Sequence, residues 1–284
     1  MSTYRELVRK YQKECSIREI PEETVKRYLL ELTQRDGINL YMDYEEQMPS
    51  ALEEEFVSGM ARILTHEPME HVLGYSWFFG YPFIVNGDVL IPRVETEELV
   101  ANILGAMDRI FPDNEVIETC DIGTGSGAIA ITLVKEEPKV HMHATDISEE
   151  ALVVARQNAE KNEADIDFVA GDMLNPLIEK GIRVDVLVCN PPYIPQEEVL
   201  EESVKDFEPH VALFGGDDGL KFYRTIFENC HKLVKEKSFM AFEMGWNQRA
   251  AMSELVSTLL PEAKFEILKD MNGKDRMLFV YFNC

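Results

Sequence analysis

The chain has 284 residues, of which 45% are apolar, so it can bury the core of one large domain or of a medium and a small one. Its formal net charge of −24 opposes binding to duplex nucleic acid, whose affinity comes largely from cations on phosphates. A basic protein or a cationic small molecule is a more natural partner. No stretch approaches the ~20 consecutive apolar residues of a membrane helix, and the polar N-terminus has no signal-peptide pattern.

The cysteines and histidines also limit the class of protein. The five cysteines are scattered and form no Cys-x-x-Cys pair, which is typical of reduced thiols in the cytoplasm. The six histidines show no metal-ligand spacing. We therefore expect a cytoplasmic, monomeric protein with no metal, no membrane contact and no direct contact with nucleic acid.

The first 75 residues are predicted to form a small helical bundle domain. Apolar residues recur at spacings of three and four in three segments, residues 4–11, 22–33 and 51–64. The pattern changes after Gly74, where residues 77–85 are aromatic and β-branched and are followed by Asn86-Gly87. Because Asn-Gly between apolar runs is a strong hairpin signal, the sequence predicts a β-hairpin linker over residues 76–91.

Strands and helices alternate from Pro92 to the C-terminus. Strands are predicted over residues 116–121, 141–146, 167–170, 184–189, 238–244, 264–269 and 277–282. Helices are predicted over residues 95–110, 128–135, 149–161, 219–234 and 248–260. This alternation predicts an α/β domain over residues 92–284, with a doubly wound and mostly parallel sheet. The last two strands are close in sequence, which indicates that one is antiparallel.

A glycine-rich loop joins the first of these strands to its helix. It contains Asp121, Gly123, Thr124, Gly125, Ser126 and Gly127. Glycines at such a position let the backbone approach a ligand closely. The Gly-x-Gly-x-Gly spacing differs from the dinucleotide fingerprint, which argues against a nicotinamide dehydrogenase, and no Lys-Ser/Thr follows to bind phosphates.

Acidic residues end the next two strands. Asp146, with Ile147 beside it, is placed to accept hydrogen bonds from ribose hydroxyls, and Asp172 to accept one from an exocyclic amine, while Met173 can cover a purine ring. A glycine loop without a phosphate lysine and two acids at successive strand ends suit a nucleoside that lacks phosphates. The sequence therefore predicts S-adenosylmethionine as the cofactor.

Asn190-Pro191-Pro192-Tyr193 follows the buried strand at residues 184–189. Such a tetrapeptide can hold a planar NH2 group, because the Asn190 side-chain oxygen and a backbone carbonyl accept its two hydrogens while the ring of Tyr193 covers its flat face. We expect these four residues to bind and activate the methyl acceptor, with Asn190 also close to the cofactor.

At this point the chain resembles the release factor glutamine methyltransferase family, HemK/PrmC, among the class I methyltransferases. The motifs that carry the resemblance lie at residues 71–75, 90–97, 121–127, 190–195, 208–209, 212–216, 218–220, 243–246 and 274–276. The resemblance implies a helical N-terminal domain that recognises release factors and a seven-stranded catalytic domain. It also implies methyl transfer to the side-chain nitrogen of the glutamine in the Gly-Gly-Gln loop of peptide chain release factors.

Two positions depart from the family pattern, and one residue pair stays without a fixed role. Val94 stands where the family usually has Pro, and Met173 stands where an aromatic residue often packs on adenine. We expect Arg93 and Glu95 either to hold the linker to the catalytic domain or to touch the release factor, although a surface ion pair would explain them equally.

Three other functions use the same residues. An adenine N6 methyltransferase would apply Asn-Pro-Pro-Tyr to a base flipped out of nucleic acid, but it should carry a basic recognition region that this sequence lacks. Methylation of a glutamine in a different protein uses identical chemistry. A cofactor-binding module without catalysis is disfavoured by the intact tetrapeptide.

Overall fold

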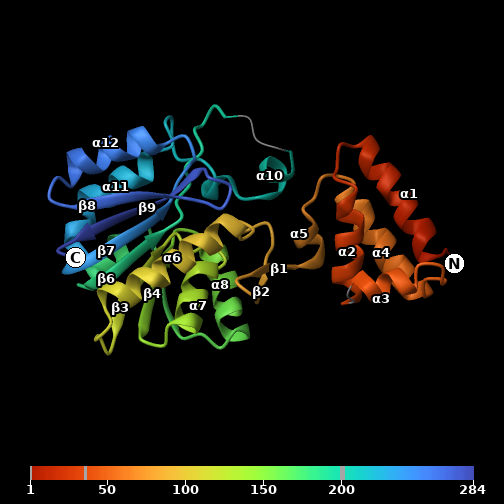
Figure 1. Cartoon of the computed structure of the whole chain (residues 1–284), viewed down its shortest axis with the longest axis horizontal. Coiled ribbons are helices and arrows are strands. Elements are labelled where there is room, and N and C mark those ends of the chain that lie inside the picture. Colours follow the sequence, from red (N-terminus) through yellow and green to blue (C-terminus); the bar gives the residue numbers. More distant parts are fainter. Residues whose placement is uncertain (1, 35–36, 199–201) are drawn as a thin grey trace. The chain divides into compact units, whose positions relative to one another are not determined.

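The computed structural model describes residues 2–34, 37–198 and 202–284 and divides them into two compact units (Figure 1). The helical unit comprises the chain up to Tyr75 together with helix α10 (Glu202–Phe207). The sheet unit runs from Ser76 and contains all the remaining described residues.

The helical unit has its own hydrophobic core. Besides α10, its helices are α1 (Tyr4–Ile17), α2 (Glu23–Thr33), α3 (Gly37–Met42), α4 (Ser50–Ile63) and α5 (Met69–Leu73). A capping box begins α1, since Thr3 and Glu6 each accept a hydrogen bond from the backbone of the other. Phe56 is fully buried in the core, stacked on Tyr28 and edge-on to Tyr11. The three predicted helices are present, and α3 and α5 are additional.

The predicted hairpin exists, but it is shorter and turns elsewhere than the sequence suggested. Strands β1 (Tyr75–Phe78) and β2 (Tyr81–Ile84) pair around Phe79-Gly80, both with positive φ. Asn86-Gly87 lies beyond β2, where the Asn86 side chain accepts a hydrogen bond from the Asp88 backbone and makes a local turn. The buried rings of Phe78 and Phe83 pack into the core of the sheet unit, so the hairpin is part of that unit.

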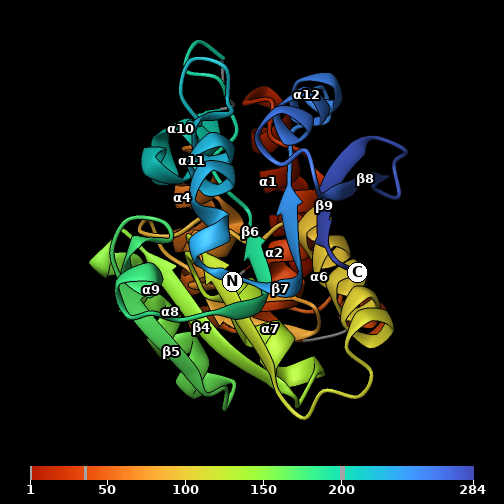
Figure 2. The ribbon, with the colours of Figure 1, turned by 90° about the vertical axis from the view of Figure 1, so that its left-hand side faces the viewer.

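The sheet unit is built on a seven-stranded sheet with the order β5-β4-β3-β6-β7-β9-β8. Its strands are β3 (Ile117–Ile122), β4 (Val140–Asp146), β5 (Ile166–Ala170), β6 (Val184–Cys189), β7 (Val234–Glu243), β8 (Lys264–Lys269) and β9 (Asp275–Phe282). The first five of these are parallel, and β9 runs antiparallel between β7 and β8. Figure 2 shows β5 and β8 at opposite edges. The doubly wound, mostly parallel fold is confirmed.

Helices cover both faces of this sheet (Figure 1). On one face lie α6 (Val94–Ile110), α7 (Ala128–Glu136) and α8 (Glu149–Lys161), and on the other α9 (Asn175–Glu179), α11 (Lys221–Asn229) and α12 (Arg249–Leu259). The predicted helix over 219–234 ends earlier, at Asn229, because Val234 already pairs with Val184 at the start of β7. No helix among the described residues is both long and apolar enough to cross a bilayer.

Candidate functional site

A cavity of about 370 Å³ opens at the carboxyl ends of β3, β4, β5 and β6. Parallel α/β sheets place ligand sites at this edge, where the chain leaves each strand for a loop. Most of the residues predicted from the sequence line the cavity: Arg93, Gly123, Thr124, Gly125, Ser126, Asp146, Ile147, Asp172, Met173, Asn190 and Pro192. Asp121, Gly127, Pro191 and Tyr193 are close to lining residues in the chain but are not among them.

The glycine loop wraps closely around the end of β4. The Gly125 backbone N–H donates to Asp146 Oδ2 at 2.8 Å, and Asp146 Oδ1 accepts from the Ser148 N–H at 3.0 Å. Gly127 begins α7 with φ of 81°, and a Cβ there would lie 3.0 Å from the Ile131 side chain. The positive φ and the close helix packing explain why glycine occupies that position.

Asp121 supports the loop from beneath. It is 1% exposed, and its Oδ2 accepts a hydrogen bond from Thr124 Oγ1 at 2.7 Å. Burial raises the pKa of this carboxyl from 3.8 to about 7, although the Thr124 hydroxyl opposes the change. Its Oδ1 is buried without a hydrogen-bond partner among the described residues, which marks a place where a polar ligand or water would be favourable.

Met173 has a left-handed backbone, with φ of 53°, directly after β5. Two hydrogen bonds hold this strand end against β4, since Thr145 Oγ1 donates to the Met173 carbonyl at 3.0 Å and the Gly171 N–H donates to the Asp146 carbonyl at 2.8 Å. These bonds place the backbone of Asp172 and Met173 at the cavity wall.

A buried carboxylate determines how Asn190 is oriented. Glu243, at the end of β7, is 2% exposed, and its Oε2 accepts from Asn190 Nδ2 at 3.0 Å and from Thr96 Oγ1 at 2.6 Å. Asn190 Nδ2 also lies 3.3 Å from Thr96 Oγ1. Since the NH2 group of Asn190 is directed to these acceptors, its Oδ1 is the atom left to accept a hydrogen bond from a ligand in the cavity.

Glu243 also holds Tyr193, whose hydroxyl donates to Oε1 at 3.1 Å. Burial, together with the neighbouring Glu243 carboxylate, raises the pKa of Tyr193 far above its ordinary value, so the hydroxyl stays a donor. Burial likewise raises the pKa of Glu243, against the effect of the Thr96 and Tyr193 donors and of Arg276. The buried acid thus connects both polar side chains of the tetrapeptide.

The segment at 213–219 braces the backbone of the tetrapeptide. The Ile194 N–H donates to the Leu213 carbonyl, and the Gly215 N–H donates back to the Ile194 carbonyl. A Cβ on Gly215 would lie 2.4 Å from the Pro192 carbonyl oxygen, and one on Gly219 would lie 2.2 Å from that of Tyr193. Only glycine permits this approach, which explains Gly215 and Gly219 in the segments at 212–216 and 218–220 that carried the family resemblance.

Arg93 forms an ion pair with a buried acid. Its Nη2 lies 2.5 Å from Glu208 Oε1, and Glu208 Oε2 accepts from the Ile91 N–H. The pair therefore holds the segment before α6 to residues 208–212, and both segments line the cavity. Glu97 also contacts the hairpin, since its Oε1 accepts from the Phe79 N–H at 2.8 Å.

The comparisons with known proteins identify the family of the chain. A family model described as the PrmC N-terminal domain matches residues 6–74, and one described as the methyltransferase small domain matches residues 106–210. A release factor glutamine methyltransferase of Bacillus subtilis is 46% identical over 74% of both chains, and one of Bacillus anthracis is 41% identical over 87% of both. The chain belongs to the release factor glutamine methyltransferase family.

Solved structures bear on the fold of this family member. A methyltransferase from Pyrococcus furiosus, with a TM-score of 0.53 and 17% identity, covers 79% of this chain and 98% of its own length. At that identity the likeness concerns the fold alone.

Sequence reasoning missed the role of Thr96 and Glu243 in this methyltransferase. Both residues stand in segments that carried the family resemblance, but nothing in those segments shows that they meet Asn190. The available signal was an acidic residue directly after the apolar run at residues 239–242, because a buried acid must find donors.

Proposed function

We propose that this protein transfers the methyl group of S-adenosylmethionine to the side-chain nitrogen of the glutamine in the Gly-Gly-Gln loop of peptide chain release factors. The observation that carries the proposal is the orientation of Asn190, whose NH2 group is held by Glu243 and Thr96 at the cavity wall. A fixed amide oxygen suits an acceptor that presents two N–H hydrogens, as a primary amide does. Translation takes place in the cytoplasm, which is therefore where we expect the protein to act.

The lining residues fit S-adenosylmethionine. Asp146 uses one lone pair of each oxygen on backbone N–H groups, which leaves acceptor capacity for ribose hydroxyls. Asp172, Met173 and Ile147 would bind the adenine side, and the glycine loop above Asp121 would bind the amino-acid side. When bound, the cofactor supplies an electrophilic methyl group on a sulfonium.

The tetrapeptide would bind and align the acceptor. Asn190 Oδ1 and the Pro191 carbonyl accept the two amide hydrogens, Tyr193 covers the amide plane, and Pro192 forms part of the wall. This localises electron density on the nitrogen and points it at the methyl group. Alignment of two bound reactants contributes ~7–11 kcal/mol in favourable systems, so most of the rate needs no strong base. The surplus N–H proton would pass to water, with S-adenosylhomocysteine as the second product.

The helical unit would recognise the release factor, as a domain of its own. An apolar patch on α3 supports this role. In the patch, Ile38, Tyr41 and Met42 are 75%, 77% and 74% exposed. Tyr41→Ser should raise KM for the release factor several-fold and leave cofactor affinity unchanged. Ile17→Ser, which changes another exposed apolar residue of the same unit, is the matched control. Equal KM values for wild type and Tyr41→Ser would contradict this role.

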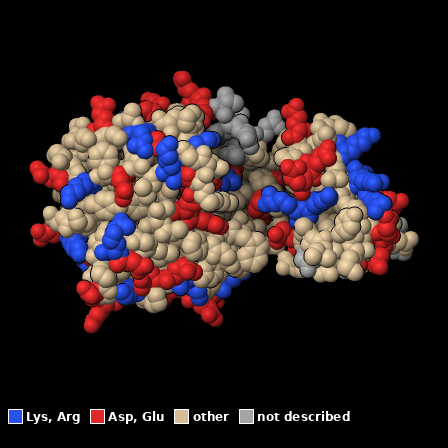
Figure 3. All heavy atoms as spheres, viewed as in Figure 1, with Lys and Arg blue, Asp and Glu red and all other residues tan. Residues whose placement is uncertain are grey.

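The experiment that tests the function offers labelled S-adenosylmethionine with unmodified release factor and, in parallel, with duplex DNA. The proposal predicts label in the release factor only. On the face shown in Figure 3, Lys and Arg side chains of the sheet unit are separated by acidic and uncharged residues, as expected for a chain that acts on protein. Label in DNA with none in protein would overturn the proposal.

A further inference from the structure

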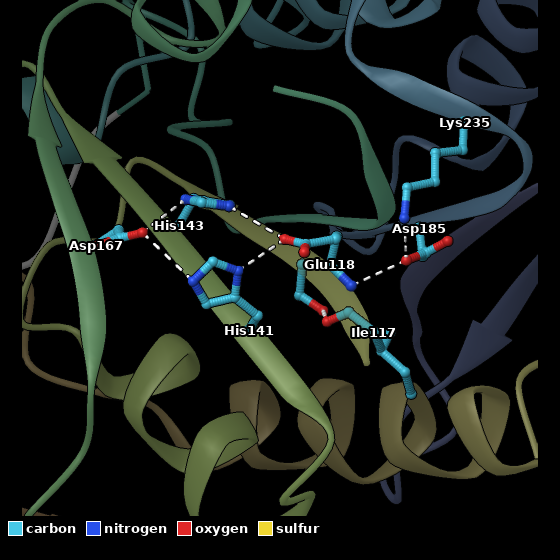
Figure 4. A network of polar contacts seen from close by, with 8 residues as sticks. Ile117, Glu118, His141, His143, Asp167, Asp185 and Lys235 are labelled. Atoms are coloured by element: carbon cyan, nitrogen blue, oxygen red, sulfur yellow. Dashed lines mark hydrogen bonds and ion pairs between the residues drawn. The ribbon is translucent and has the colours of Figure 1, made fainter. Parts of the chain in front are cut away.

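Four ionisable side chains gather at the other end of the sheet, where strands β3, β4 and β5 begin (Figure 4). Glu118 pairs in register with His141, and His143 pairs with Asp167. Since alternate residues of a strand point to the same face, His141 and His143 project side by side. The histidines have none of the usual metal-ligand spacings in the sequence, but the His-x-His pattern within β4 brings two of them together.

The distances in this cluster suit a single metal ion. Glu118 Oε2 lies 2.9 Å from His141 Nδ1 and 3.3 Å from His143 Nε2, and one ligand atom from each residue lies within 4.8 Å of the other two. In a tetrahedral site with metal–ligand bonds of about 2.0–2.1 Å, neighbouring ligand atoms are about 3.3 Å apart. Small side-chain rotations would therefore bring all three donors onto one ion.

Asp167 occupies the position of an outer carboxylate. Its Oδ2 lies 3.4 Å from His141 Nε2 and 3.4 Å from His143 Nδ1, the two ring nitrogens that face away from Glu118 (Figure 4). Histidines that bind metals usually donate their other N–H to a carboxylate, which fixes the tautomer. His143 is 7% exposed, and its Nδ1 makes no hydrogen bond to any described residue, although Asp167 Oδ2 is 3.4 Å away. A metal ion on Nε2 would place the ring proton on Nδ1, where it could be donated to Asp167.

Charge and access also favour a cation. The Glu118 carboxyl lies against both imidazole rings. With Asp167, the cluster then holds two carboxylates. The nearby Lys235 ammonium pairs with Asp185, which accepts from the Glu118 backbone. A hollow of about 600 Å³ gives an ion a route to the site, and its ionisable lining comprises His143, Glu160, Asp165 and Asp167 together with Arg156 and Lys180.

We propose that Glu118, His141 and His143 bind a divalent transition-metal ion, with Asp167 orienting both imidazoles from outside and water completing the coordination. Two imidazoles and one carboxylate are a donor set that Zn²⁺ favours, and Cu²⁺ and Ni²⁺ would compete for it. The site joins two adjacent strands at the edge opposite the cofactor cavity. Its expected effect is therefore on the stability of the sheet unit.

The test is titration of the full, untagged, chelator-treated chain with ZnCl2, followed by calorimetry, and with CoCl2, followed by visible absorption. The proposal predicts one equivalent bound with a dissociation constant at or below the micromolar range. It predicts d–d bands of tetrahedral nitrogen and oxygen coordination and a higher Tm. Glu118→Gln and His141→Ala, which change partly exposed side chains, should weaken binding at least 100-fold, and Asp167→Asn by about 10–100-fold.

The matched control is His231→Ala, which removes an exposed histidine outside the cluster and should bind like wild type. Two results would overturn the proposal. One is an absence of saturable binding, which would leave the four residues as a hydrogen-bonded network only. The other is binding that survives in Glu118→Gln and His141→Ala, which would place the ion elsewhere in the chain. Thiolate charge-transfer bands in that case would assign the metal to cysteines such as the exposed Cys284.

Discussion

Glu243→Gln tests the claim that a buried carboxylate orients Asn190. The wild-type carboxylate accepts hydrogen bonds from Thr96, Asn190 and Tyr193 on its two oxygens. A glutamine amide offers one oxygen and places an NH2 group against at least one of these donors. The donor that loses its acceptor either stays unsatisfied or, for Asn190, turns its amide and presents NH2 to the cavity.

The size of the effect follows from the bonds that are lost. A hydrogen bond to a charged group contributes about 1.5–3 kcal/mol. If that bond is what fixes Asn190 in the transition state, kcat/KM for the release factor should fall about 10- to 100-fold, at 1.36 kcal/mol per tenfold. Cofactor affinity should stay within error of wild type, because Glu243 is not among the residues that line the cavity.

The assay is steady-state methyl transfer, with cofactor affinity measured by calorimetry on the same preparations. Glu266→Gln is the matched control, since it makes the same carboxylate-to-amide change at the acceptor of a Tyr281 hydroxyl hydrogen bond of 2.6 Å on β8. It should leave kcat/KM unchanged. Wild-type kcat/KM in Glu243→Gln would refute the reasoning, and a parallel loss of cofactor affinity would show that the fold, not the orientation of Asn190, had changed.

Two further predictions concern stability. Burial raises the pKa of Asp121 to about 7, so the folded chain binds the carboxyl proton more tightly than the unfolded chain does. The stability that this proton contributes is fully present below about pH 4 and is lost as the pH rises through 7. The test is urea unfolding of the cofactor-free chain at several pH values. Between pH 4 and 8 the free energy of unfolding should fall by up to about 4 kcal/mol more in wild type than in Asp121→Asn. The same dependence of the unfolding free energy on pH in both proteins would contradict this prediction. Gly219→Ala should lower Tm more than Gly273→Ala does. Both positions have positive φ, but only Gly219 lies against the Tyr193 carbonyl. An equal decrease in Tm for the two variants would contradict the packing argument.

The sheet could be predicted because its signals are local. Alternating apolar runs and amphipathic segments located every strand of the sheet and its longer helices, with Val184–Cys189 and Lys264–Lys269 matching the structure, but they did not predict the short helix α9. The hairpin was misplaced because Asn86-Gly87 is a strong turn signal that here makes a local turn, whereas burial of Phe78 and Phe83 decides which residues pair.

Interactions between distant residues could not be predicted in the same way. Thr96, Asn190 and Glu243 come from α6, the end of β6 and the end of β7, and only the parallel order of the sheet brings them together. The same applies to Glu118 and His141, which lie on neighbouring strands but 23 positions apart. Sequence patterns located the strand ends, and the register of the sheet determined which side chains meet there.

The central claim is tested most directly by mass spectrometry of the release factor after reaction with wild type, Asn190→Ala and Asn283→Ala. Asn283 donates to the Glu236 carbonyl at the exposed end of the chain, so its variant controls for loss of an asparagine elsewhere. The account predicts one methyl group on the glutamine side chain of the Gly-Gly-Gln peptide with wild type and Asn283→Ala, and none with Asn190→Ala. Methylation of another residue, or an unchanged rate with Asn190→Ala, would contradict it.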